Sequence, residues 1–423
     1  MPPVDGRPRT VLTARERRLA GALALAGAAA FAYGAAFGDA VRAWQALLVN
    51  FLFFTGLAQA GVVLSALVQL TSARWARPLK RAAEATAGFL PVSIVLLAVL
   101  LAGLPAWAPW AGAAGHARQG WLTVPWFAAR EAAGFLLLLS ISAAYLYQSV
   151  RPDVGLLQEL DGRPPAGFAA RLIARWHGAA LERDLCQRSQ SRLAPVVLIA
   201  YGWVFSLVAF DFVMALDHHW YSALAGGHFF TSSLLAGIAL LAVAAACRER
   251  LGLAAHVGRR QLRDLGTLLF GFAILWAYLL WSQYLVIWYG DLPEEAAFVG
   301  RRLQGAWAPL AWLAVGLTFL LPFVVLLSRR VKASARGLAA VAGGVLAGLW
   351  LERFVLVAPS LTPGDGLPLG LPELLVTAGA LGAFVLCYAR FLATVPVLPI
   401  SDPKLAPAAP AGGGAPAAVS ASR

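Results

Sequence analysis

The sequence predicts an all-α integral membrane protein with about ten transmembrane helices. Of its 423 residues, 60% are hydrophobic and only 13% are charged, and the mean hydropathy is +0.71. Soluble domains carry about 25% charged residues, so this composition excludes an ordinary soluble protein. A helix needs roughly 20 apolar residues to cross a hydrocarbon core of about 30 Å, and the chain contains about ten such runs.

Each apolar run predicts one helix. The first run, 19–37, follows several arginines, so a cleaved signal peptide is an alternative; its removal would leave nine helices and the same asymmetry of charge. The later helices are predicted, in order, at 44–70, 88–104, 126–150, 193–216, 229–247, 266–288, 308–328, 337–357 and 371–395.

The formal net charge of +13 is a signal of topology. Most lysines and arginines lie on alternate loops and at the two ends, whereas the intervening loops hold only Arg42, Arg118, Arg301 and Arg302. The positive-inside rule therefore places both termini in the cytoplasm. Since topology and attraction to anionic lipids account for the charge, the lipid bilayer is an expected partner and nucleic acid is not.

The chain divides into three parts. Residues 1–18 form a cytoplasmic N-terminal segment, 19–395 form the membrane domain, and 396–423 form a cytoplasmic tail. The tail is rich in Ala, Pro and Gly and poor in bulky apolar residues, which predicts disorder. Within 151–192, apolar residues recur at helical spacing against arginines, which predicts a helix in the cytoplasmic interface of the membrane or a helix that docks a partner.

The sequence predicts no metal site and no haem bound by this chain. Cys186, Cys247 and Cys387 are far apart and form no CxxC spacing. No histidine falls at the centre of a predicted helix, where a transmembrane haem usually needs its opposed ligands.

An internal similarity indicates a repeat. The segment "FFTGLAQAGVVLSA" at 53–66 matches "FFTSSLLAGIALLA" at 229–242 at several positions. Both segments belong to helices that run from outside to inside, so helices two to five would repeat as helices six to nine. Chance agreement between helices rich in Phe and Ala is the alternative.

Polar side chains on five helices share one depth, the outer third of the membrane, and the sequence offers little comparable at the inner side. An unpaired charge there costs on the order of 3 kcal/mol, so such residues face protein or water. In a structural interpretation, carboxylates such as Asp211 pair with arginines such as Arg353, and the amides bridge helices. In a functional interpretation, the group is a proton path or a quinol pocket. Its members are Asn50, Arg130, Glu131, Asp211, Gln283, Glu352 and Arg353.

The seventh predicted helix is unusually aromatic around Gln283. Flat rings beside a polar group suit a quinone head group, although aromatic rows more often serve packing. The candidate quinol-contacting residues are Trp281, Tyr284, Trp288 and Tyr289.

A second aromatic group ends the fifth predicted helix in the stretch "FDFVMALDHHWYS". His218 and His219 precede Trp220 and Tyr221 there, a position typical of the aromatic belt at a membrane interface. We interpret these histidines as residues of the outer interface rather than as ligands.

Four motifs in order along the chain resemble the ActF subunits of bacterial alternative complex III, which belong to the polysulfide-reductase membrane-subunit (NrfD-like) superfamily. The motifs are "LVNFLFFTGLAQAGVVLSALVQLTSARWARPLKR", "LVAFDFVMALDHHWYSALAGGHFF", "LWAYLLWSQYLVIWYGDLPEE" and "GLWLERFVLVAPS". The resemblance extends over about 19–395. It implies two NrfD-like four-helix bundles plus two additional helices.

The resemblance implies an integral membrane subunit of a quinol:electron acceptor oxidoreductase in a respiratory or photosynthetic electron transport chain of the bacterial inner membrane. Such a subunit binds no redox cofactor. Its partners are a homologous NrfD-like subunit, a periplasmic iron–sulfur protein and c-type cytochromes, which supply the iron–sulfur clusters and haem c. Menaquinol or ubiquinol is the implied quinol.

The role of this chain within such a complex stays open at this stage. The sister subunit's quinol-contacting pattern matches here only at "FDF" around Asp211, so quinol binding, proton translocation and a purely structural anchor are all retained, and no catalytic residue is predicted. A small-solute transporter is a further alternative. It requires polar groups at mid-depth on interrupted helices, and the concentration in the outer third argues against it.

Overall fold

The computed structural model describes residues 7–111, 120–162, 167–217, 219–362 and 366–405. Those residues form helices joined by short connections, with no β-strand among them. Ten helices are long and apolar enough to cross a membrane, which confirms the predicted multi-pass architecture.

The first five spans occupy the N-terminal half of the chain. They are α1 (Ala14–Phe37), α2 (Ala40–Leu70), a composite third span, α6 (Val124–Asp161) and α8 (Ala179–Phe212), which η3 (Met214–Leu216) extends. The third span is built from η1 (Arg77–Leu79), α3 (Lys80–Glu84), η2 (Ala85–Phe89) and α4 (Leu90–Ala102), and α5 (Leu104–Trp107) follows it. Between α6 and α8 lies the short α7 (Phe168–Leu172).

The remaining five spans occupy the C-terminal half. They are α9 (Ala225–Ala246), α11 (Arg259–Gly290), a composite eighth span, α16 (Ala335–Leu361) and α17 (Leu371–Thr394). The eighth span is built from η4 (Gly305–Trp307), α13 (Ala308–Val315), the π-helical η5 (Gly316–Leu320) and α14 (Leu321–Val325). The short connecting helices are α10 (Arg248–Leu251), α12 (Pro293–Leu303) and α15 (Arg329–Lys332).

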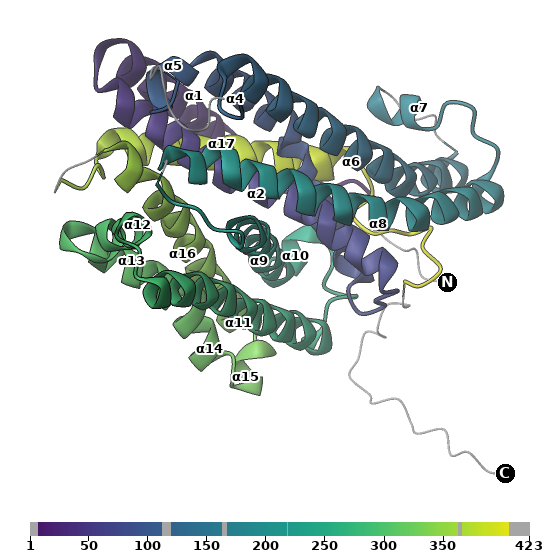
Figure 1. The fold of residues 1–423 in the computed structure, drawn as a ribbon. Coiled ribbons are helices and arrows are strands. Elements are labelled where there is room, and N and C mark those ends of the chain that lie inside the picture. The colour runs from purple at the N-terminus through teal and green to yellow at the C-terminus, as the bar shows by residue number, and fades with distance from the viewer. Residues whose placement is uncertain (1–6, 112–119, 163–166, 218, 363–365, 406–423) are drawn as a thin grey trace.

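Eight of the spans fall into two consecutive sets of four along the chain. We call α2, α4, α6 and α8 the first bundle, and α9, α11, α13 to α14 and α16 the second bundle. The two groups lie one above the other in Figure 1, with α1 and α17 packed together beside α2. The backbone N–H of Arg9 donates to the carbonyl oxygen of Leu392 (3.0 Å), so the start of α1 and the end of α17 lie on one side, which we call the terminal face. The opposite side is the far face.

The two segments of the sequence repeat form the most buried helices of the molecule. The apolar windows of α2 and α9 are 89% and 78% buried, and the two helices pack against each other. A Cβ added to Gly237 would lie 2.6 Å from the Cβ of Ala60, so this glycine permits the close approach. Each bundle therefore contributes one central helix to the contact between the bundles.

Small residues also set the packing of α1 on α17. A Cβ at Gly27 would lie 2.6 Å from the Cα of Gly379, and Gly382 faces the backbone of Ala20. Helices in lipid gain little from burying apolar surface, so close backbone contact and dispersion hold them together.

The prediction of an interfacial helix within 151–192 is wrong about the length of that helix. α6 continues to Asp161 and α8 already begins at Ala179. Among the described residues between them, only the five of α7 are helical. Leu172 and Ile173 are buried against apolar side chains of α6 instead of facing lipid. The extension of α6 beyond the apolar run offers these residues a protein surface, so they do not need the membrane interface.

The predicted disorder of 396–423 does not apply to its first ten residues. Val397 and Leu398 are buried, and the hydroxyl of Ser401 donates to Asp153 Oδ1 (2.6 Å). Anchoring by these apolar and polar contacts outweighs the weak helical and strand propensity of the segment. Residues 406–423 lie outside the described part of the chain.

The contact between α1 and α17 gives a first prediction. We expect Gly27→Val to push the two helices apart and to lower the free energy of unfolding in detergent by about 1–3 kcal/mol, because overpacking a close contact forces backbone shifts. Thermal unfolding followed by circular dichroism measures the change. Gly21→Val on the same helix is the control, since nothing lies within 4 Å of its added Cβ. Equal midpoints for both variants would contradict the packing described.

Candidate functional site

A groove of about 960 Å³ opens in the second bundle, in the half of the membrane nearer the far face. α9, α11, α13, η5 and α16 line it, and α12 borders its end. Ligand sites for drug-sized molecules span about 300–1,000 Å³, so the volume is at the upper end of that range. The wall is mostly apolar and aromatic, and its polar side chains are His228, Gln283, Arg302 and Glu352.

A π-helical turn shapes one wall of the groove. Pro322 has no N–H to donate to the carbonyl of Thr318, and the helix widens over Gly316–Leu320. Phe319 of this turn lines the groove. Thr318 points the other way, toward Gly348 of α16, where a Cβ would lie 2.5 Å from its hydroxyl oxygen. The turn thus directs a ring into the groove and brings the helix backbone close to α16.

Glu352 of α16 is the carboxylate of the groove, and it is only 6% exposed. Its Oε1 accepts a hydrogen bond from Trp276 Nε1 of α11 (3.0 Å) and lies 3.3 Å from His228 Nε2 of α9. Its Oε2 has no hydrogen-bond partner and lies 3.6 Å from Nη1 of Arg353. Three helices therefore meet at one carboxylate that keeps an acceptor atom available.

Arg353 is fixed on the other side of α16 by α9. Its Nη2 donates to the carbonyl of Phe229 (3.1 Å) and to Ser233 Oγ (3.1 Å), and it also bonds Ser232 Oγ. The guanidinium carbon lies 3.9 Å above the ring of Phe229. The serines that hold it belong to the "FFTSS" segment of the repeat.

Asp211 does not pair with Arg353, contrary to the pairing that the shared depth suggested. Its partner is Arg130 of α6, with Nη2 to Oδ2 at 2.6 Å, and Trp121 Nε1 donates to its Oδ1 (3.0 Å). Glu131 is buried next to this pair. Arg130 also stacks over the Trp121 ring at 3.9 Å. The centre belongs to the first bundle, where it joins α6 to α8.

The seven residues of the predicted polar group therefore do not form one cluster. Glu352 and Arg353 lie in the second bundle, whereas Asp211, Arg130 and Glu131 lie in the first. A common depth in the membrane fixes only one coordinate of each side chain, and the rotation of each helix separates them.

Of the two amides expected to bridge helices, Asn50 does so, whereas Gln283 bonds to a connection outside the helices. Asn50 Nδ2 donates to Thr377 Oγ1 of α17 (3.0 Å), and its Oδ1 accepts from Trp350 Nε1 of α16 (3.1 Å). Gln283 Oε1 accepts from Ser222 Oγ (3.2 Å), which ties α11 to the connection before α9, and Gln283 also lines the groove.

Three of the four predicted aromatic residues line the groove. Trp281, Tyr284 and Trp288 do so, whereas Tyr289 is 87% exposed and points away from it. Trp281 and Tyr284 are in contact, with ring centroids 5.6 Å apart. The groove wall thus contains part of the row of rings that the sequence indicated.

The connection after α8 lies under α12. Trp220 stacks on Phe298 of α12 with ring centroids 3.8 Å apart, and Asp217 pairs with Arg301 of the same helix. His219 Nδ1 lies 3.7 Å from Glu294 Oε2. His218 lies outside the described residues. The aromatic end of "FDFVMALDHHWYS" therefore packs on protein and closes the far end of the groove.

His228 and Trp276 are site residues that sequence reasoning missed. His228 precedes "FFTSS" by one residue and fell just outside the predicted helix, yet it is buried in the first turn of α9. Trp276 is one of several aromatic residues in its helix, and the sequence does not show which of these rings forms a hydrogen bond and which only packs.

The larger omission is a buried group of charges near the terminal face. Arg77, Arg81, Glu84 and Asp153 are completely buried, and Lys80 is 4% exposed. The sequence placed the basic residues in a loop, so the expectation of little polar content at the inner side is wrong. Two features of the sequence could have indicated these buried charges. Glu84 follows Lys80 by four residues, and Asp153 lies two residues after Arg151 in "VRPDV".

Comparison of the chain with models of protein families gives no match, and comparison with curated proteins gives no match.

The separation of the two centres gives a second prediction. In a double-mutant cycle, Asp211→Asn and Arg130→Gln should couple by about 1 kcal/mol or more, because they share a buried ion pair. Asp211→Asn and Arg353→Gln should be additive within about 0.5 kcal/mol. Unfolding by denaturing detergent in mixed micelles measures both cycles. Coupling of Asp211 to Arg353 instead of Arg130 would contradict the arrangement.

Proposed function

We propose that this chain is the membrane subunit of a quinol:electron acceptor oxidoreductase of the NrfD-like type, and that it binds quinol in the groove of the second bundle. The single observation that carries the proposal is the groove itself, an aromatic and apolar cavity that ends at the Glu352 carboxylate. The four motifs of the sequence support the same class of protein.

The chemistry of the groove suits a quinol. A quinol joins a flat ring with two hydroxyl groups to an isoprenoid tail, so it needs aromatic walls, a polar end and an opening toward lipid. Trp281 and Trp312 are both more than half exposed where they line the groove, which gives the tail access from the lipid side. Glu352 Oε2 is an acceptor for a ring hydroxyl, and Gln283 is a second polar contact.

Glu352 and His228 give the ring hydroxyl a route for its proton. A carboxylate accepts the proton at Oε2, and the imidazole 3.3 Å from Oε1 is a second basic group in line with it. In this proposal the chain itself does not accept the electrons of the quinol. They pass to iron–sulfur clusters and haem c in periplasmic partner subunits, so the far face is periplasmic and the terminal face is cytoplasmic in a bacterial inner membrane.

The Asp211 centre favours a second, structural role. Arg130 and Trp121 occupy both oxygens of Asp211, and the centre lies outside the groove. The centre stabilises the packing of α6 on α8. Such a stabilising contact fits a chain that acts as a membrane anchor. A small-solute transporter is less well supported, because the wall of the groove is mostly apolar and the groove opens sideways where Trp281 and Trp312 are exposed.

Purification of the native assembly tests membership of a complex. A tagged chain isolated in mild detergent from its own membranes should bring with it partners that show the visible absorption of c-type haem, and the preparation should oxidise quinol. A chain that purifies alone and without haem-bearing partners would contradict the proposal.

The groove gives a third prediction. Glu352→Gln and Trp281→Ala in the intact assembly should each weaken the binding of a short-chain quinol about tenfold, through loss of a charge-assisted hydrogen bond and of ring contact respectively. Titration followed by quenching of tryptophan fluorescence measures the dissociation constant. Trp203→Ala is the matched control, because Trp203 is 62% exposed on α8 and does not line the groove. Unchanged quinol affinity in both groove variants would contradict the assignment of the groove as a quinol site.

A further inference from the structure

The completely buried charges near the terminal face form a compact network. Arg81 bridges Glu84 through Nη1 and Asp153 of α6 through Nη2. Lys80 Nζ lies 4.0 Å from Glu84 Oε1 and donates to Gln190 Oε1 of α8 (2.9 Å). Isolated charges would not be stable here, so each depends on the others.

Hydroxyl groups extend this network toward the membrane centre. Glu84 Oε1 accepts from Ser65 Oγ and from Ser149 Oγ, both at 2.6 Å. The Ser65 hydroxyl is 3.0 Å from that of Tyr145. The carboxylate of Glu84 is therefore joined to a chain of hydroxyl groups on α2 and α6.

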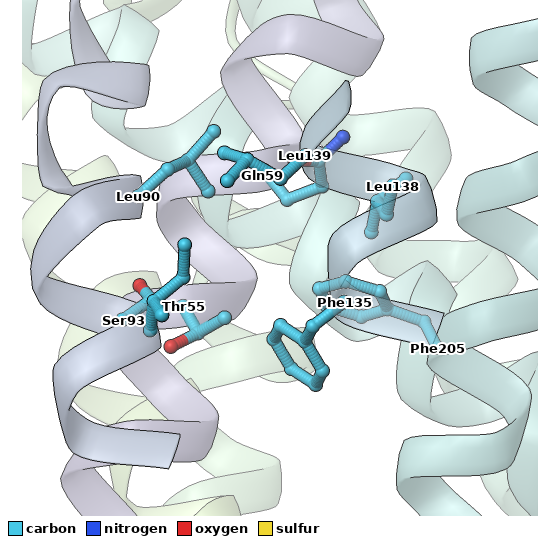
Figure 2. A pocket seen from close by; sticks show the side chains of 9 residues that line it. Thr55, Gln59, Leu90, Ser93, Phe135, Leu138, Leu139 and Phe205 are labelled. Carbon is cyan, nitrogen blue, oxygen red and sulfur yellow. The ribbon is translucent and has the colours of Figure 1, made fainter. Parts of the chain in front are cut away.

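One helical turn farther along α6, the polar groups continue. Gln59 Nε2 donates to Ser142 Oγ (2.9 Å), and both lie between the hydroxyl chain and a small cavity. The cavity has a volume of about 10 Å³, room for about one water molecule. Figure 2 shows Thr55, Gln59 and Ser93 around it, and Thr55 Oγ1 is buried without a hydrogen-bond partner. We call the groups from Asp153 to Thr55 the polar column.

Aromatic rings close the column on the side of the far face. Phe135 lines the cavity, and Phe51 contacts both Phe135 and Phe212, with ring centroids 5.7 and 5.6 Å apart. This layer stands between Thr55 and the Asp211 centre along α2, α6 and α8. These rings separate the column from the Asp211 centre, and its charged end lies at the terminal face.

At the terminal face the end of the chain covers the column. We call residues 395–405 the C-terminal cap. The backbone N–H and hydroxyl of Ser401 donate to Asp153 Oδ1 (2.8 and 2.6 Å), and Asp402 Oδ2 lies 2.6 Å from Arg77 Nη1. Lys404 Nζ donates to Ser72 Oγ after α2 (2.7 Å). The cap has no regular secondary structure. Its buried residues 395–399 and these side-chain contacts hold it, together with turn hydrogen bonds such as that from Asp402 N–H to the Pro399 carbonyl (3.0 Å).

We propose that Glu84 and Asp153 form a proton-exchange site of the first bundle, and that the C-terminal cap controls its access to water at the terminal face. A hydronium ion from that side forms an O–H bond with a carboxylate oxygen and leaves water behind; the reverse step releases the proton. The site is separate from the groove and does not rest on quinol binding.

The charges around the site explain why the cap matters. The ionisable groups that face Glu84 and Asp153 are Arg77, Lys80, Arg81, Tyr145 and Asp402, with Cys186 of α8 also in the field of Asp153. With the cap in place, three cations face three carboxylates. Displacement of the cap removes Asp402, leaves Arg77 without its carboxylate and opens Asp153 to water.

Infrared spectroscopy of the full chain in its native assembly tests the proposal. After a rapid fall in pH on the terminal side of membrane vesicles, the C=O band of protonated carboxyl groups should rise slowly in the native protein. In Ser401→Ala combined with Asp402→Asn it should rise at least about tenfold faster, equivalent to about 1.4 kcal/mol of barrier. Thr394→Ala is the control, because that hydroxyl bonds only to the Phe391 carbonyl within its own helix.

Two further variants assign the band. Glu84→Asp retains the charge and should shift the band, and Asp153→Asn should remove part of its amplitude. The combined Ser401→Ala and Asp402→Asn variant should bind a short-chain quinol with native affinity, because neither residue lines the groove, which separates this site from quinol binding. A cap variant that follows the native kinetics, or a band that neither Glu84→Asp nor Asp153→Asn alters, would overturn the proposal.

Discussion

The free-energy cost of an unpaired charge in hydrocarbon governs which helices are neighbours in this protein. The apolar helices have almost no preference for one partner over another in lipid, so polar contacts supply the selectivity. Arg130 with Asp211 joins α6 to α8, Arg81 with Asp153 joins α3 to α6, and Arg353 with the serines of α9 joins α16 to α9. Glycines then let the chosen helices approach closely, as at α1 on α17.

The two bundles have similar central helices but different interiors. In the second bundle, the central helix α9 places His228 at a wide groove that opens to lipid. In the first bundle, α2 places Thr55, Gln59 and Ser65 along a narrow interior with space for about one water molecule. The groove has room for a bulky amphipathic ligand, whereas the cavity described in the first bundle has room for about one water. Two similar central helices are therefore surrounded by interiors of very different size.

The sequence predicted the number and order of the spans because the bilayer imposes one length on every helix. It also predicted that Asn50 bridges helices. It could not predict that Asp211 pairs with Arg130, since hydropathy gives the depth of a residue but not the rotation of its helix. It missed His228 because the residue lies at a helix boundary, and it assigned 396–405 to a disordered tail because composition does not reveal the buried charges that anchor Ser401 and Asp402.

In the segment Arg77–Glu84, charge in the sequence and burial in the fold have different causes. Its basic residues contribute to the charge asymmetry from which the sequence predicts an orientation, yet Arg77 and Arg81 are completely buried in the fold. Orientation is decided by charge near the ends of spans, whereas burial requires carboxylates that arrive later in the chain, Asp153 on α6 and Asp402 after α17. Arginines that the sequence counts toward topology are thus partners of acids far along the sequence in the fold. The terminal face can close only after the last span has been placed.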